Sequence, residues 1–306
     1  MSNKIVFMGT PEFSVETLEV LAKSSENIAC VYTQPPKKSY RGQKLNISPI
    51  QKVSERLGIR FRTPESLDNN DEYEFFKKIE PDIIVVVAYG KIIPKKYLEI
   101  KNSIFINIHA SLLPRWRGAA PIQRSIMNSD QETGITIMKI EEKLDSGPYM
   151  RQVKIRINNK INTKDLSNKL SKLGAENILD CINLIKKNEV NFTEQDDSQA
   201  TYAKKIKKSE SKIVWQENAN EIIARINGLN PSPGAWFQYK KTRYKIWKAV
   251  ASNLQGIPGE IIDDNLTIAC KDYAIKIVEI QKEGKNKLSL ENFLKGEIIP
   301  KNTVIS

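Results

Sequence analysis

The sequence predicts an α/β protein: a mostly parallel sheet with helices on both faces, followed by a smaller domain of short strands. Over the first 150 residues, short apolar runs alternate with stretches that place apolar residues at helical spacing, as in repeated βα units. From about Ser209, strand-like runs follow one another closely between Gly, Pro and Asn turns. Such spacing is typical of a small β-barrel or sandwich.

The elements of the first part follow from its apolar pattern. The run at 82–89 is continuously apolar, as expected of a strand buried on both faces of a parallel sheet. Gly58 could end a helix that begins at Ser48, and Gly174 could break a long one. We expect strands at residues 4–9, 27–34, 59–61, 82–89, 103–110 and 134–140, and helices at 14–24, 48–58, 72–79, 120–129 and 162–187.

A polar, weakly periodic segment separates the two patterns. We therefore expect a first domain at residues 1–189, a linker at 190–206 and a second domain, the β-barrel, at 207–306.

Composition limits the class of protein. Hydrophobic residues make up 40% of the 306, but we find neither the run of roughly 20 apolar residues that a membrane helix needs nor a signal-peptide layout at the N-terminus. Three scattered cysteines and one histidine favour reduced thiols in a cytoplasmic protein and argue against a metal site. The net charge of +12 favours nucleic acid as a partner, unless it only reflects a lysine-rich genome.

The single histidine belongs to a candidate polar cluster. Side chains alternate along a strand, so Asn107 and His109 project from one face, at the carboxyl end where open α/β sheets bind ligands. Asp145 follows the expected strand 134–140. If that strand runs parallel to 103–110 as its neighbour, the Asp145 carboxylate emerges at the same edge and orients the imidazole. The alternative is structural: a polar strand end and an ordinary turn aspartate.

The residue types in this cluster suggest acyl transfer to an amine. An asparagine amide can stabilise an oxyanion and a histidine can move a proton, while no nucleophile elbow surrounds Ser111. A dinucleotide site is not expected, because the turn after the first strand carries only Gly9 where the fingerprint needs three glycines.

Three motifs resemble the formyltransferase family that uses 10-formyltetrahydrofolate: Asn107-Ile-His109, the segment 111–123 (SLLPRWRGAAPIQ) and Leu144-Asp-Ser-Gly147. Likeness extends over essentially the whole chain and is particularly strong to the members that act on methionyl-tRNA. The resemblance implies a Rossmann-like catalytic domain and an OB-like barrel that binds tRNA. It also implies that the α-amino group of methionine on the initiator tRNA accepts the formyl group.

The resemblance assigns roles to individual residues. Asn107, His109 and Asp145 would be catalytic, and no metal is implied. The formyl donor, 10-formyltetrahydrofolate, would contact Ser111, Leu112, Leu113, Pro114, Tyr89 and Gly90. We expect a monomer with no membrane partner. Rival interpretations are a formyltransferase for an amino-sugar nucleotide or another small amine, a non-catalytic nucleic-acid-binding protein, and a hydrolase that deformylates folate.

Basic residues mark the expected tRNA contacts. The long loop after the second strand carries four positive charges and no acid, and the end of the linker is rich in lysine. Period-2 spacing would put three more cations on one strand face of the second domain. The expected contacts are Lys37, Lys38, Arg41, Lys44, Lys204, Lys205, Lys207, Lys241, Arg243 and Lys245, although solvated charge alone could explain them.

Overall fold

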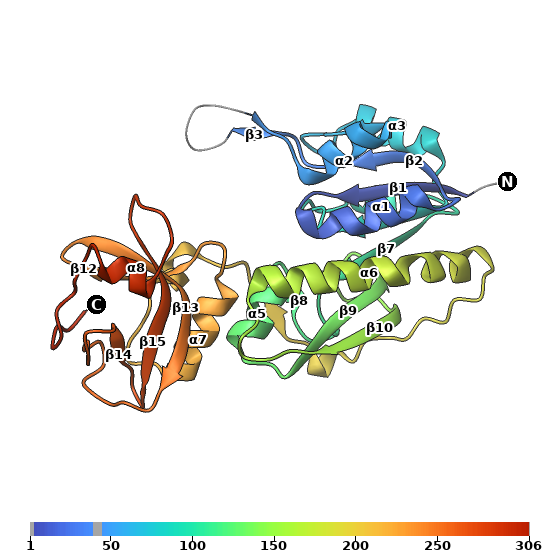
Figure 1. Cartoon of the computed structure of the whole chain (residues 1–306). Helices are drawn as coiled ribbons and strands as arrows, with labels where there is room; N and C mark the ends of the chain where they lie inside the picture. Colours follow the sequence, from blue (N-terminus) through green and yellow to red (C-terminus); the bar gives the residue numbers. More distant parts are fainter. Residues whose placement is uncertain (1–2, 39–44, 306) are drawn as a thin grey trace. The chain divides into compact units, whose positions relative to one another are not determined.

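A computed structural model describes residues 3–38 and 45–305, which form two compact units (Figure 1). The first unit comprises Met1–Gly118, Gly134–Ile155 and Ser167–Tyr202, and the second comprises Ala119–Thr133, Arg156–Leu166 and Ala203–Ser306. The prediction treated each domain as one continuous segment, whereas residues 119–133 and 156–166 group here with the second unit. No helix among the described residues combines the length and hydropathy of a membrane span.

The first unit is built on a seven-stranded sheet of order β10-β9-β7-β6-β1-β2-β5. The five strands from β7 to β5 pair in parallel, which confirms the predicted Rossmann-like sheet. Chain order runs outward from β1 in both directions, so the crossovers reverse between β1 and β6. The strands are β1 (Lys4–Gly9), β2 (Asn27–Tyr32), β5 (Phe61–Arg62), β6 (Ile83–Val87), β7 (Ile104–His109), β9 (Glu132–Lys139) and β10 (Tyr149–Arg156).

Strand β9 is the neighbour of β7, as expected, but it is antiparallel, which corrects the parallel arrangement considered from the sequence. The connection between the two strands, residues 110–131, contains helix α5 (Pro121–Met127). Side chains alternate along a strand in the same way for either direction, so the pattern of β9 did not predict which direction it takes. Strand β10, which the sequence analysis missed, continues the antiparallel edge of the sheet.

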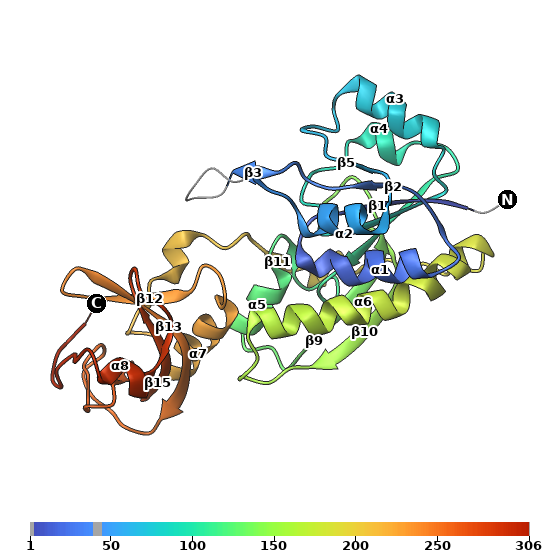
Figure 2. The same cartoon turned by 45° about the horizontal axis from the view of Figure 1, so that its top comes forward.

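Helices cover both faces of this sheet (Figure 2). On one face α3 (Asn70–Ile79) and α4 (Lys95–Leu98) enclose an aromatic cluster in which Phe76 packs on Tyr97 and Phe105. On the other face lie α1 (Val15–Lys23), α2 (Pro49–Leu57) and α6 (Thr163–Lys186). Helix α6 continues through Gly174 without a break. A glycine is needed there for close packing, because an added Cβ would lie 2.8 Å from Ile108 Cγ2.

The predicted helix 48–58 is confirmed with its caps. The Ser48 side chain accepts a hydrogen bond from the Gln51 backbone N–H, and Gly58 ends the helix in the left-handed region at φ 66°.

The second unit contains a five-stranded antiparallel sheet, which confirms the predicted C-terminal β domain. Its order is β12-β13-β15-β14, and β16 shares an edge of β15 with β14. Register shifts around Lys248 bend the long strand β13 around the core. The elements are α7 (Ala219–Gly228), β12 (Ala235–Tyr239), β13 (Thr242–Ser252), β14 (Thr267–Ala269), β15 (Ala274–Lys282), β16 (Leu288–Ser289) and α8 (Leu290–Leu294).

Short elements complete the described chain. The hairpin strands β3 (Lys37–Lys38) and β4 (Leu45–Asn46) pair antiparallel. Strand β8 (Arg117–Gly118) pairs with β11 (Tyr202–Ala203), so residues expected to be a free linker are bonded to the folded chain. The 3-10 turns are Glu12–Ser14, Asp197–Gln199 and Lys208–Ser211.

Candidate active site

The topology of the sheet places a binding site at the carboxyl ends of β1 and β6, where the crossovers reverse. Two hydrogen bonds join these strand ends: Thr10 Oγ1 and Gln34 Nε2 donate to the Tyr89 carbonyl at 2.8 and 2.9 Å. Gly90, the next residue, is exposed and left-handed at φ 77°. Tyr89 itself is buried, so it supports this rim through its carbonyl and does not face a ligand.

Strand β7 continues the rim with its two polar residues. Phe105, Asn107 and His109 share one face, and α3 and α4 cover Phe105. Asn107, two residues on, is only half-buried, and no hydrogen bond joins its amide to another described residue. An amide in this position remains available to a ligand.

His109 is buried and held from two sides. Its Nε2 lies 2.9 Å from the Trp116 carbonyl, and its Nδ1 lies 3.6 Å from Asp145 Oδ2. A carbonyl oxygen only accepts, so Nε2 carries a proton in this contact. The same Asp145 oxygen accepts a hydrogen bond from the Gly118 backbone N–H at 2.8 Å. The structure therefore brings His109 and Asp145 together.

Asp145 reaches His109 by a route that the sequence did not reveal. Because β9 is antiparallel to β7, its last residue, Lys139, pairs with Ile106 rather than lying beside His109. The turn 140–148, which joins β9 to β10, brings the carboxylate back. Asp145 has a left-handed backbone at φ 48°, a conformation that residues other than glycine seldom adopt.

The segment 111–114 is fixed mainly by internal hydrogen bonds. Ser111 is fully buried and its hydroxyl donates to the Arg115 carbonyl at 2.6 Å. The Thr136 hydroxyl donates to the Ser111 carbonyl and accepts from the Leu113 N–H. Leu113 is also buried, so Leu112 and Pro114, both half-buried, are the members whose side chains can meet a ligand.

Two contributors escaped the sequence analysis. Gln195 Nε2 donates to the carbonyls of Asp145 and Gly147, and its Oε1 accepts from Arg117. Gln195 lies in the segment expected to be a linker, 50 residues from Asp145, and no motif marks it. Arg117 was noted only as part of the motif at 111–123.

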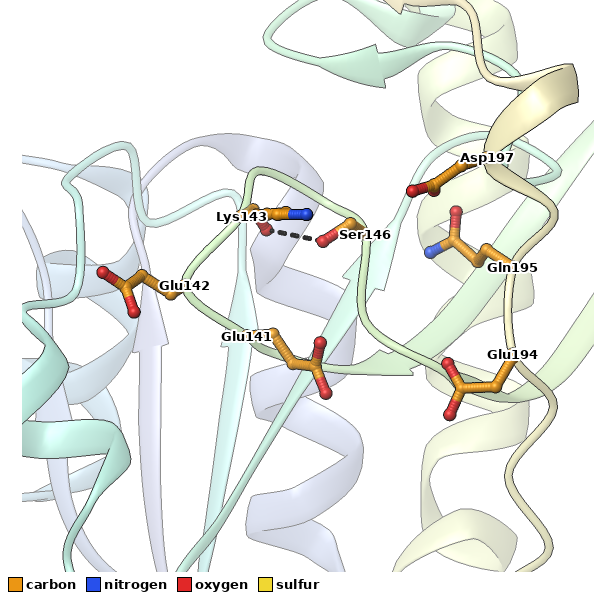
Figure 3. Close-up of a pocket in the computed structure, with 7 residues that line it drawn as sticks. All are labelled: Glu141, Glu142, Lys143, Ser146, Glu194, Gln195 and Asp197. Carbon is orange, nitrogen blue, oxygen red and sulfur yellow. Dashed lines mark hydrogen bonds between the residues drawn. The ribbon is translucent and has the colours of Figure 1, made fainter.

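An acidic cleft is lined in part by residues of the turn 140–148 (Figure 3). Four carboxylates and one lysine line it, so it repels a polyanion such as tRNA. None of its lining residues lies at the ends of β1, β6 or β7. Its lining residues are Glu141, Glu142, Lys143, Ser146, Glu194, Gln195 and Asp197. Elsewhere too, the described residues contain no group of three His, Cys, Asp or Glu side chains placed to hold a metal ion.

Of the basic residues expected to contact tRNA in the first unit, Lys37 and Lys38 form strand β3 of the β3–β4 hairpin. Lys37 is exposed and its Nζ donates to Gln34 Oε1 at 2.8 Å, which ties the hairpin to the rim beside Tyr89. Arg41 and Lys44 lie outside the described residues, as does the side chain of Lys38.

The basic residues of the second unit are arranged differently from the prediction at one position. Lys204, Lys205 and Lys207 are exposed. Arg243 and Lys245 share a strand face, but Lys241 lies in the turn before β13 with φ 66°, which corrects its predicted place on that face. Both strand cations stack on indole rings: Arg243 lies 4.4 Å from the centre of Trp236, and Lys245 lies 5.3 Å from that of Trp247.

Comparisons with known proteins identify the family of the chain. The family described as "Formyl transferase" matches residues 3–182, and "Formyl transferase, C-terminal domain" matches residues 205–297. A methionyl-tRNA formyltransferase of Pelagibacter ubique (strain HTCC1062) is 52% identical over 308 residues, covering 100% of this chain and 99% of the relative.

Solved structures show the same fold at low identity. The N-formyltransferase of Helicobacter canadensis, in complex with folinic acid and dTDP-3-aminofucose, has a TM-score of 0.67 at 20% identity and covers 92% of this chain and 100% of its own. HypX of Aquifex aeolicus, in complex with tetrahydrofolic acid, has a TM-score of 0.62 at 16% identity. The match covers 98% of this chain, which spans about half the length of HypX.

Proposed function

Because this chain belongs to the formyl transferase family and matches methionyl-tRNA formyltransferases over its whole length, we propose that Asn107, His109 and Asp145 are its catalytic residues. The reaction follows from the family. The formyl group of 10-formyltetrahydrofolate passes to the α-amino group of methionine on the initiator tRNA, giving N-formylmethionyl-tRNA.

The reaction proceeds by attack of the amine nitrogen on the formyl carbon, which makes a tetrahedral oxyanion. The C–N bond to the folate then breaks, the folate nitrogen takes up a proton and the attacking nitrogen loses one. The observation that best supports a role for Asn107 is its half-buried amide, unpaired among the described residues, on the strand face of His109. An amide donor at the oxyanion typically contributes about a hundred- to a thousand-fold in rate.

His109 carries the proton towards the departing folate nitrogen, and Asp145 holds the ring. The 3.6 Å separation between Asp145 Oδ2 and His109 Nδ1 supports this assignment. For transfer, the Nε2–H exchanges the Trp116 carbonyl for a substrate atom. General acid–base assistance of this kind is worth about a hundred- to ten-thousand-fold.

The folate lies at the strand ends of the first unit. Gly90 offers exposed backbone there, and Leu112 and Pro114 offer half-buried apolar surface for a ring system. Ser111 and Leu113 support this surface from within, since both are buried and bonded to Thr136. Tyr89 is buried and supports the site only indirectly, through the bonds of its carbonyl to Thr10 and Gln34.

Single-turnover formylation tests the catalytic residues. Asn107→Ala and Asp145→Ala should each lose most of the rate while their melting curves stay close to that of the wild type. Asn183→Ala, on the exposed face of α6, is the matched control. A near-normal single-turnover rate in either site variant removes that residue from the mechanism.

Binding of the tRNA falls to basic residues of both units. Those of the segment 37–44 recognise the acceptor end, and those at 204–207 and on β13 contact phosphates. Arg41→Ala should therefore weaken use of tRNA far more than it weakens folate binding, and equal losses would contradict the assignment. Each neutralised phosphate adds about 0.9 to the slope of log affinity against log salt. An amino-sugar substrate would give a nearly flat dependence, so a salt series separates these acceptors.

The charged tRNA that serves as acceptor is made in the cytoplasm, and we place the enzyme there. We expect it to act as a monomer, which sedimentation equilibrium can test. A stable dimer would overturn that expectation.

A further inference from the structure

We propose that Gln195 is a positioning residue for catalysis. Its side-chain amide holds the Asp145 turn in place by bonding to backbone carbonyls of the turn, and Arg117 holds the amide from the other end. This inference rests on the proposed role of Asp145. Gln195 lies in a polar segment outside the family motifs, and we infer that it acts without touching the substrate.

Gln195 makes four hydrogen bonds around the turn. Its Nε2 donates to the carbonyl of Asp145 at 3.0 Å and to that of Gly147 at 2.7 Å. Its Oε1 accepts from Arg117 Nε at 3.0 Å and Nη2 at 2.8 Å. Both ends of the amide are therefore used, and its orientation is fixed because a carbonyl accepts and a guanidinium donates.

Arg117 connects this amide to the rest of the site. Its side chain is 4% exposed and also donates to Asp197 Oδ1 at 2.7 Å. Its backbone lies between Trp116, whose carbonyl accepts from His109, and Gly118, whose N–H donates to the Asp145 carboxylate. The residues that touch His109 and Asp145 thus share one network with Gln195.

The segment that carries Gln195 is anchored on both sides of it. Thr193 exchanges two backbone hydrogen bonds with Tyr149, at 2.9 and 2.8 Å. Thr201 accepts from the N–H groups of Trp116 and Arg117 and donates to the Pro114 carbonyl. Gln195 therefore projects from a fixed backbone.

The Asp145 turn needs such support. Its left-handed backbone at φ 48° is disfavoured for aspartate, and the next residue, Ser146, lines the cleft of Figure 3. Two hydrogen bonds from the Gln195 amide hold the carbonyls of Asp145 and Gly147. Without them the carboxylate can drift from His109, and a displacement of about 1 Å in a catalytic group can cost about a hundred-fold in rate.

Two substitutions test the proposal in the full-length protein. Gln195→Ala removes all four hydrogen bonds, and Gln195→Glu keeps an acceptor for Arg117 but loses the donor to the turn. Each should lower kcat by about ten- to a hundred-fold, with KM for methionyl-tRNA and for folate within about two-fold of the wild type. Gln199→Ala, on the same segment and bonded only to Asp196, should leave kcat unchanged. Wild-type kcat in Gln195→Glu overturns the proposal, and this variant remains informative if Gln195→Ala fails to fold.

A double-mutant cycle tests whether Gln195 acts through Asp145. In the Asp145→Ala background, Gln195→Glu should lower the remaining rate less than two-fold, because the group it positions is gone. A full ten-fold loss in that background contradicts positioning of Asp145. If Asp145→Ala itself retains near-normal turnover, the proposed catalytic set fails. If Asp145→Ala is inactive while Gln195→Glu is normal, only the inference about Gln195 fails.

Discussion

Replacement of Gly147 by alanine should damage both stability and turnover, for a reason visible in the backbone. Gly147 is buried at the end of the Asp145 turn, where an added Cβ would lie 2.1 Å from the Lys139 carbonyl oxygen and 3.1 Å from Glu141 Cγ. The carbon of Glu141 can move aside. The carbonyl cannot easily move, because Lys139 belongs to β9 and its N–H is bonded to the Pro148 carbonyl.

The magnitude follows from this contact. Ordinary van der Waals contact begins at 3.4 Å, so 2.1 Å leaves a deficit of 1.3 Å that the turn must absorb. Such overpacking costs about 1–3 kcal/mol, and loss of the bond from Gln195 to the Gly147 carbonyl adds about 1 kcal/mol. We expect the free energy of unfolding to fall by about 2–4 kcal/mol. A shift of this size in the Asp145 turn should also lower kcat by about a hundred-fold.

The assay compares Gly147→Ala with Gly296→Ala in urea unfolding and in formylation kinetics. Gly296 has open space around the position of an added Cβ, so its variant should behave as the wild type. If Gly147→Ala unfolds at the same urea concentration as Gly296→Ala and keeps its kcat, the steric reasoning is refuted.

Three further outcomes are expected. Burial raises the pKa of the Cys30 and Cys181 thiols to about 11 and that of Cys270 to about 12. Native protein at pH 8 should therefore not react with a thiol reagent, whereas in unfolded protein three thiols should react. A native protein with one fast-reacting thiol would contradict this expectation. A hydrogen bond from Arg124 holds the pKa of Glu210 below its ordinary value of 4.5, so the pair stabilises the fold above pH 4.5 and less as the pH falls through the lowered pKa. Arg124→Ala should therefore cost about 1 kcal/mol at pH 7 and less at pH 3 in urea unfolding; an equal cost at both values would exclude the ion pair as the cause. Gly174→Ala should lower the free energy of unfolding by about 1 kcal/mol, although alanine has the better helix propensity. In an Ile108→Ala background, where the clashing side chain is gone, the same substitution should be neutral or stabilising. A double-mutant cycle measures this difference.

The elements with long, regular patterns were predictable from the sequence. The apolar run that forms β6 and the capped helix α2 both appear where expected. Helix α7 was missed, although Asn218 and Glu221 form a capping box and Ile222, Ile223 and Ile226 have helical spacing. The segments that follow it in the sequence are strands, and the prediction treated the whole region as strands and turns. The direction of β9 could not be predicted, because the alternation of side chains along a strand is the same for a parallel and an antiparallel neighbour.

The candidate site divides in the same way. Alternation along a strand was enough to put Asn107 and His109 on one face. The approach of Asp145, by contrast, depends on a turn that is bonded to Gly118 and Gln195, residues distant in sequence. No local pattern encodes such contacts, so the carboxylate could be proposed but its route could not.

The polar stretch between residues 190 and 202 has a practical consequence for anyone who recombines relatives of this enzyme. Its composition invites a splice point near residue 190, so that a foreign C-terminal half could be grafted onto the native catalytic half. A chimera joined there would take Thr193, Gln195 and Thr201 from the foreign protein. Their bonding partners Tyr149, Arg117 and Trp116 would still come from this chain. Splicing after Tyr202 keeps those partners together. Chimeras joined at the two points should differ in activity even when both carry the same donor half.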